Sequence, residues 1–163
     1  MSTSTQQLQR LADELEIRSL VARFANACNP PNLEAFGKLW VPDTHQKGEW
    51  SLSEPFTTSA TGVDDIVTLL DKLLQPWDFF VQLVHSGVVD IDGDEATGRF
   101  IMHEVAKGPN ETYYNNFAIY EDKYCKVDGK WFFAKRHYNY MFLDSGPFGG
   151  NVCPPIEGWF SRK

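Results

Sequence analysis

Residues 78–141 read DFFVQLVHSGVVDIDGDEATGRFIMHEVAKGPNETYYNNFAIYEDKYCKVDGKWFFAKRHYNYM. Four runs rich in β-branched and aromatic residues alternate here with three short polar turns, a composition typical of strands. The runs are Asp78–Asp90, Ala96–Ala106, Tyr113–Lys126 and Trp131–Met141, and the turns are Asp92-Gly93-Asp94, Gly108-Pro109-Asn110 and Asp128-Gly129-Lys130. An Asp-Gly pair between two such runs is a strong hairpin signal. The stretch therefore predicts an antiparallel meander.

Three segments with helical periodicity precede these strands. The first runs from about Thr5 to Asn26 and ends before Pro30-Pro31, while Asn32 can cap a second helix and Gly62 opens a third. A short strand is expected near Glu49–Leu52. The apolar positions of the first helix recur at helical spacing: Leu8, Leu11, Leu15, Leu20, Val21, Phe24 and Cys28. Helices followed by a meander predict an α+β fold whose curved sheet surrounds a cavity.

Length and charge limit the classes of protein and partner. A chain of 163 residues is expected to form one domain, 1–163. The net charge of -7 argues against a nucleic-acid partner, which requires a basic surface. No run of 18 apolar residues is present, so we expect no membrane span, and the polar N-terminus lacks the apolar stretch of a signal peptide. We therefore predict a cytoplasmic protein.

The residues that bind metals and cofactors are scattered. Three cysteines, Cys28, Cys125 and Cys153, are far apart, and the four histidines form no HxH or HxxxH pair. Glycine-rich phosphate loops are absent as well. We expect neither a metal nor a cofactor. The aromatic share of 14% is high, which fits either core filling or a pocket for a flat apolar ligand.

The C-terminal segment, 142–163, is rich in Gly and Pro and cannot form a regular element. It nevertheless carries apolar side chains, namely Phe148, Val152, Ile156, Trp159 and Phe160. We expect this tail to dock over the mouth of the pocket or on a partner subunit.

Five segments of the chain resemble the SnoaL-like branch of the nuclear transport factor 2-like superfamily: 11–25, 33–43, 61–66, 89–96 and 120–131. The resemblance covers residues 8–137. It implies an α+β barrel, or cone, in which three N-terminal helices pack on a strongly curved, mostly antiparallel sheet that encloses an apolar pocket. It also implies a homodimer or homotrimer. This fold hosts cyclases, dehydratases, isomerases, epoxide hydrolases, dehydrochlorinases and non-catalytic dimerisation modules, so the fold alone does not give the function.

This chain has other residue types at the two positions where several enzymes of that family have a catalytic pair. Those enzymes use an Asp near the end of the first helix and a His on the first long strand, where this chain has Asn29 and Gln82. Amides can hydrogen-bond a substrate but cannot act as a base. Asn29 can alternatively cap the helix before Pro30. His85 alternates with Gln82 and faces the other way, unless a bulge at Ser86-Gly87 turns it inward.

Two further positions can place an acid or base in the pocket. His103 and Glu104 are neighbours on the second long strand, so one of them must face inward. A Glu in an apolar cavity has a raised pKa and can shuttle protons. His137 and Tyr138 are likewise neighbours on the last strand, so they face opposite sides of the sheet. We expect the side chains on one of these two faces to line the pocket.

Phenol and amide groups gather on the third long strand, where Tyr114, Asn116 and Tyr120 share a face. Such donors in an apolar cone suit the stabilisation of a developing enolate or phenolate. Alternatively, the aromatic rings simply fill the face of the sheet.

Our leading hypothesis is a cofactor-independent lyase or isomerase that acts on a small apolar, aromatic or polycyclic metabolite by elimination, isomerisation, cyclisation or retro-aldol cleavage. The candidate catalytic residues are His85, His103, Glu104, Tyr120 and His137. The candidate substrate-binding residues are Asn29, Gln82, Tyr114, Asn116 and Tyr138. One alternative is a non-catalytic small-molecule-binding or dimerisation module, which the missing Asp–His pair favours. Another is an epoxide or lactone hydrolase, which needs a carboxylate pair around a water molecule.

Overall fold

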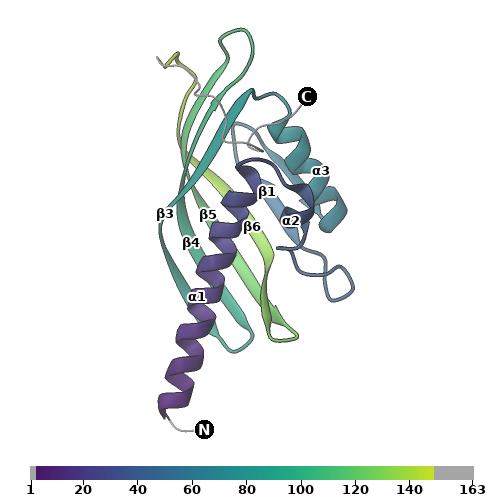
Figure 1. The fold of residues 1–163 in the computed structure, drawn as a ribbon, viewed down its shortest axis with the longest axis vertical. Helices are drawn as coiled ribbons and strands as arrows, with labels where there is room; N and C mark the ends of the chain where they lie inside the picture. The colour runs from purple at the N-terminus through teal and green to yellow at the C-terminus, as the bar shows by residue number, and fades with distance from the viewer. Residues whose placement is uncertain (1–2, 149–163) are drawn as a thin grey trace.

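A computed structural model of the chain describes residues 3–148. Three helices and six strands follow one another in the order α1 (Thr3–Cys28), α2 (Leu33–Gly37), β1 (Glu49–Leu52), β2 (Thr58–Thr61), α3 (Val63–Leu74), β3 (Phe79–Asp92), β4 (Glu95–Lys107), β5 (Tyr113–Val127) and β6 (Lys130–Asp144). Figure 1 shows α1 lying across one face of the long strands, with α2 and α3 beside it. The predicted helices and the four long strands are confirmed, and β2 is an additional short strand in a segment that reads as polar and turn-rich.

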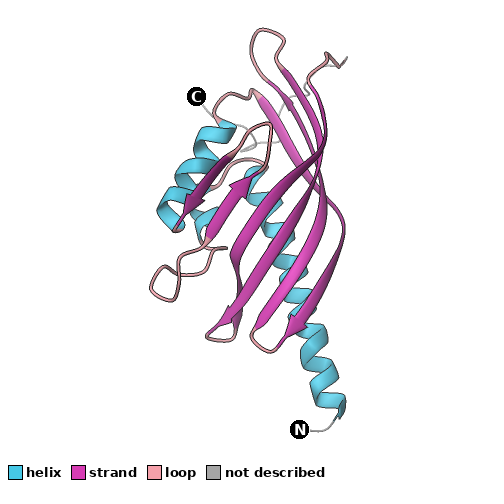
Figure 2. Cartoon of the chain, turned by 180° about the vertical axis from the view of Figure 1, so that it is seen from behind, coloured by secondary structure: helices cyan, strands magenta, loops and turns pink. Residues whose placement is uncertain are grey.

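The strands form one six-stranded sheet in the order β2-β1-β6-β5-β4-β3. Among the six described strands, β1 and β6 are the only parallel pair, and the other neighbouring strands pair antiparallel. Figure 2 shows the long strands twisting and curving together without closing into a barrel. The α+β architecture is therefore confirmed, with a sheet that is strongly curved and open.

The last strand is longer than the sequence predicts. β6 continues to Asp144, so residues 142–144 belong to the sheet and the tail begins after them. Their partners are residues of β5: Phe142 pairs with Phe117, Leu143 with Asn116 and Asp144 with Asn115. The rest of the tail from 149 to 163 lies outside the described residues, and its docking stays a prediction.

Helix α1 packs on the sheet through its C-terminal half. Ile17, Leu20 and Phe24 are buried in the core, but Leu8 and Leu11 are 65% and 64% exposed. The prediction that the early leucines, Leu15 included, belong to the packed face is wrong. The reason is geometric. The N-terminal turns of α1 project beyond the strands (Figure 1). At helical spacing, the early leucines also lie on a different side of α1 from the buried Ile17. Within residues 3–148, no helix combines the length and apolar character needed to cross a membrane.

A buried ion pair supports the aromatic core. Arg136 and Asp122 are joined by two hydrogen bonds of 2.8 and 3.1 Å, and both side chains are fully buried. The guanidinium also lies 3.7 Å from the ring centroid of Tyr120 and 4.2 Å from that of Phe24. Because delocalised charge and ring faces attract each other, this pair can be held in an otherwise apolar region. It fixes the rings that form the floor of the cavity.

Candidate active site

A cavity of about 510 Å³ lies between α1, α3, β1 and the inner face of the long strands. Most of its wall is apolar, formed by aromatic and aliphatic side chains such as Phe24, Leu52, Leu70, Trp77 and Phe80. The exposed residues in its lining mark its mouth: Phe56, Lys72, Pro76, Thr112 and Ser145. The volume and the apolar wall suit a small flat ligand.

Strand alternation brings one set of polar side chains to this inner face. Gln82 of β3 pairs with Glu104 of β4, and Glu104 pairs in turn with Asn116 of β5. Tyr120 of β5 pairs with Tyr138 of β6. Residues directly opposite each other on adjacent strands have neighbouring side chains. The polar groups are therefore clustered because of the register of the sheet.

Glu104 is the centre of this cluster. Its Oε1 accepts a short hydrogen bond from Gln82 Nε2, and its Oε2 accepts from Tyr114 Oη at 3.2 Å and from Asn116 Nδ2 at 3.1 Å. The side chain is only 7% exposed. Among the described residues, no Lys or Arg forms an ion pair with Glu104. The carboxyl group is thus held by neutral donors alone.

This environment raises the pKa of Glu104. Burial is the largest cause, because it disfavours the ionised form, and hydrogen bonds from the amides and phenols offset part of the effect. A carboxyl group with a raised pKa keeps its proton to higher pH than an ordinary glutamate, which suits a general acid or base. Glu104 is also the only carboxylate among the described residues that line the cavity. A hydrolase that needs two carboxylates around a water molecule is therefore not supported.

Two amide oxygens in the cluster have no partner. With both NH2 groups directed at Glu104, the buried Oε1 of Gln82 and Oδ1 of Asn116 accept no hydrogen bond. Buried polar atoms normally have a partner, and each exception requires an explanation. The cluster therefore lacks donors, and a proton on Glu104 or a hydroxyl group of a ligand would supply one.

Four tyrosines line the cavity around Glu104: Tyr114, Tyr120, Tyr138 and Tyr140. Tyr138 Oη accepts a hydrogen bond from Asn116 Nδ2, and its own hydroxyl group hydrogen-bonds the Glu104 carboxyl. Burial raises the pKa of Tyr120 and Tyr138 well above the ordinary phenol value. The phenols therefore stay protonated and act as hydrogen-bond donors.

Asn29 does not line the cavity, although the sequence places it among the candidate substrate-binding residues. Its side chain is fully used on the backbone of β3: Nδ2 donates to the carbonyl oxygen of Gln82 at 2.7 Å, and Oδ1 accepts from the Gln82 amide at 2.9 Å. Asn29 thus fixes the end of α1 to the strand that carries Gln82. Asn116 is likewise fully buried behind Glu104 and does not line the cavity.

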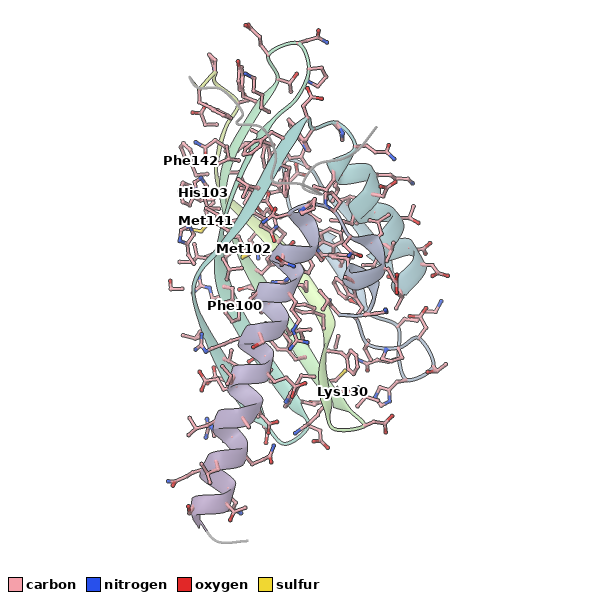
Figure 3. All side chains as sticks on the ribbon, viewed as in Figure 1. Phe100, Met102, His103, Lys130, Met141 and Phe142 are labelled. Atoms are coloured by element: carbon pink, nitrogen blue, oxygen red, sulfur yellow. The ribbon has the colours of Figure 1, made fainter. Side chains whose placement is uncertain are left out.

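The three candidate histidines lie on the outer face of the sheet, so the expectation that one of them enters the cavity is wrong. The predicted bulge exists between Val84 and Gly87, but His85 stays exposed and stacks near His103, with 6.0 Å between ring centroids. His103 Nε2 lies 2.9 Å from Asn115 Oδ1, and His137 Nδ1 lies 2.7 Å from Ser51 Oγ. Figure 3 shows His103 on the side of the sheet away from α1.

Alternation explains these outcomes. Glu104 faces inward, so its neighbour His103 must face outward, and Tyr138 and Tyr140 line the cavity in place of His137. Gln82, Tyr114, Tyr120 and Tyr138 are brought together as expected. Tyr140 was signalled only by its spacing of two from Tyr138.

Some wall residues carry no motif that could have identified them, Cys28 and Phe56 among them. Burial raises the pKa of the Cys28 thiol strongly, so this residue stays a neutral part of the wall. Within residues 3–148, no group of three or more His, Cys, Asp or Glu side chains is arranged to hold a metal ion.

Residues 9–137 match the SnoaL-like domain. The chain belongs to this family. The sequence matches no protein of curated function.

Crystal structures confirm the fold. LinA superposes with a TM-score of 0.78 at 20% identity, covering 91% of this chain and 99% of LinA. A putative scytalone dehydratase from Novosphingobium aromaticivorans gives a TM-score of 0.74 at 20% identity. The superposition covers 92% of this chain and 97% of that protein. An NTF2-like protein with a cystatin-like fold from the same species gives a TM-score of 0.70 at 24% identity. The superposition covers 84% of this chain and 87% of that protein.

Proposed function

We propose that this SnoaL-like protein is a cofactor-independent lyase or isomerase that acts on a small apolar aromatic molecule, with Glu104 as the acid or base. The observation that carries the proposal is the buried Glu104 carboxyl, held by three neutral donors at the wall of an apolar cavity. A group of this kind is suited to removing a proton from a carbon acid and returning it elsewhere on the same molecule. Elimination, isomerisation and cyclisation all use that step.

The tyrosines supply the complementary function. When Glu104 removes a proton next to a carbonyl group, negative charge develops on the carbonyl oxygen. The hydroxyl proton of Tyr138, which hydrogen-bonds Glu104 in this structure, can be donated to that oxygen instead, and Tyr120 presents a second phenol from the same wall. Fixed donors in a water-poor site stabilise such a charge more strongly than water does. The apolar rings of the wall would position the flat part of the substrate.

The structural relatives support the class of reaction. LinA is named a hexachlorocyclohexane dehydrochlorinase, and another relative is a putative scytalone dehydratase. Both names describe eliminations from small ring compounds. Their identity to this chain is about one residue in five, so the likeness supports the type of chemistry and leaves the substrate to be found by experiment.

Proton abstraction can be tested before the substrate is known. The protein is incubated in D2O with 1-tetralone, an apolar bicyclic ketone with an enolisable CH2 group, and deuterium uptake is followed by NMR. We expect the protein to accelerate the uptake and Glu104→Gln to abolish this acceleration, with a loss on the order of 10²-fold or more. His103→Gln is the matched control, because His103 is the neighbouring residue on the opposite face of β4.

The results separate the possible roles. Equal deuterium uptake in Glu104→Gln and the unmodified protein would show that Glu104 is not the base. A loss in His103→Gln would contradict the assignment of the chemistry to the inner face. Binding of the ketone without any acceleration in either protein would favour the second candidate, a non-catalytic binding module. The amides at the positions of the family's Asp–His pair, Asn29 and Gln82, are the observation that keeps this second candidate open.

A further inference from the structure

Glu104 is enclosed, yet an acid or base must exchange its proton between turnovers. The side chain is 7% exposed and lies at the inner wall of the cavity. Two of its partners are the amides of Gln82 and Asn116. An amide NH2 group donates a hydrogen bond but does not accept a proton at nitrogen, so it cannot pass one on. Its other partners, Tyr114 and Tyr138, are hydroxyl groups and can do so.

Tyr114 connects Glu104 to the mouth of the cavity. Its Oη lies 3.2 Å from Glu104 Oε2 and 3.4 Å from Tyr140 Oη. Tyr140 is only partly buried, and its ring packs at 5.7 Å against Phe56, which is 51% exposed at the mouth. Three oxygen atoms that carry exchangeable protons thus form an unbroken row from the buried carboxyl to the solvent side.

The hydroxyl protons of the row can be arranged in two ways. Tyr114 has one hydroxyl proton, which it can donate to Glu104 Oε2 or to Tyr140 Oη. When it donates to Glu104, the Tyr140 hydroxyl can donate to Tyr114 Oη in its turn. The other phenol that hydrogen-bonds Glu104, Tyr138, does not offer such a path, because it is only 2% exposed.

We infer that Tyr114 and Tyr140 form a proton relay that connects Glu104 with solvent. The inference rests on the proposed role of Glu104 and adds the route of its proton. When the carboxylate is reprotonated, hydronium at the mouth gives a proton to Tyr140 Oη. The former Tyr140 proton passes to Tyr114 Oη, and the Tyr114 proton passes to Glu104 Oε2. Each phenol loses one O–H bond and gains another, water is released, and no atom changes its oxidation state.

The relay can be tested without a substrate. The protonated carboxyl group of Glu104 gives an infrared C=O band, which is assigned by its absence in Glu104→Gln. After rapid mixing with D2O at mildly acidic pH, the shift of this band reports the exchange of its proton. We expect Tyr140→Phe and Tyr114→Phe to slow the exchange on the order of 10²-fold, the lower range of what positioned proton transfer contributes.

The control is Tyr113→Phe, because Tyr113 is a phenol in the cavity lining that does not contact Glu104, Tyr114 or Tyr140 through its hydroxyl. We expect it to exchange at the unmodified rate. Circular dichroism and the Glu104 band itself show whether each variant is folded with its site intact. Unchanged exchange in folded Tyr140→Phe would overturn the relay, as would the absence of a Glu104 band at every pH at which the protein is folded.

This result is separable from the proposed function. Loss of deuterium uptake by 1-tetralone in Glu104→Gln tests whether Glu104 is the base. The infrared exchange tests only how its proton reaches water. Fast exchange in both phenylalanine variants, together with active proton abstraction, would leave Glu104 as the base and remove the tyrosines as its route.

Discussion

Glu104 is a carboxyl group surrounded by hydrogen-bond donors but by no paired cation. Three donors would suit a carboxylate, whereas burial favours the neutral acid. Burial is the larger effect, so the pKa of Glu104 is raised. The two amide oxygens without partners, on Gln82 and Asn116, fit this interpretation, since a protonated Glu104 could donate to one of them after rotation of the amide.

The raised pKa of Glu104 predicts how stability depends on pH. In the unfolded chain this group ionises at its ordinary value, whereas the folded protein retains the proton to higher pH. The free energy of unfolding should therefore fall as pH rises from the unfolded pKa through the folded pKa, by about 1.4 kcal/mol for each unit of difference. Below the pKa of the unfolded state, Glu104 is protonated in both states, and the free energy of unfolding does not change with pH through this group.

Glu104→Gln should remove this dependence. We expect the variant to gain stability relative to the unmodified protein as pH rises, and to lose that advantage in acid. Urea unfolding at a series of pH values measures it. Glu54→Gln, at an exposed glutamate, serves as the control and should follow the unmodified protein. Parallel curves for Glu104→Gln and the unmodified protein would mean that burial does not raise the pKa of Glu104.

Helix α1 has two halves with different energetic roles. Leu20 is 4% exposed in the core, whereas Leu11 is 64% exposed on the projecting half. Leu20→Ala should lower the free energy of unfolding by about 2–5 kcal/mol, because it leaves a cavity. Leu11→Ala should change it by about 0.5 kcal/mol or less. Chemical denaturation of the two variants compares the same substitution on the same helix.

A large effect of Leu11→Ala would contradict the assignment of this leucine to solvent. The apolar stripe of Leu8, Leu11 and Leu15 would then have to pack against another surface in solution. Dependence of the denaturation midpoint on protein concentration would identify that surface as a second copy of the chain. The homodimer or homotrimer expected from the family resemblance stays a prediction until such a measurement is made.

The elements could be predicted from the sequence better than the burial of single residues could. Asp-Gly turns and alternating apolar residues mark the long strands, because both signals are local. The periodicity of the sequence could not show that α1 extends beyond the edge of the sheet, since this depends on the lengths of elements that are distant in sequence. Alternation restricted His103 and Glu104 to opposite faces, but which of them faces inward depends on where the helices pack.

The cavity is a property of the whole molecule. Its wall contains residues of α1, α3, β1 and the four long strands, for example Phe24, Leu70, Trp50 and Phe80. A ligand that fills the space touches most elements at once. Its binding free energy should therefore appear as added stability of the entire domain.

Binding of a small bicyclic phenol, 2-naphthol, should raise the free energy of unfolding in one cooperative transition. The expected gain is about 2.7 kcal/mol at a ligand concentration of roughly 100 times Kd. Leu73→Trp should abolish this gain, because Leu73 lines the cavity and an indole there would occupy the space. Leu83→Trp makes the same change at a residue of the outer face that is 45% exposed, and should retain it. Thermal unfolding with and without 2-naphthol measures both variants. An unreduced gain in Leu73→Trp would place the ligand outside the cavity, and a gain lost equally in both variants would show that the cavity wall does not determine binding.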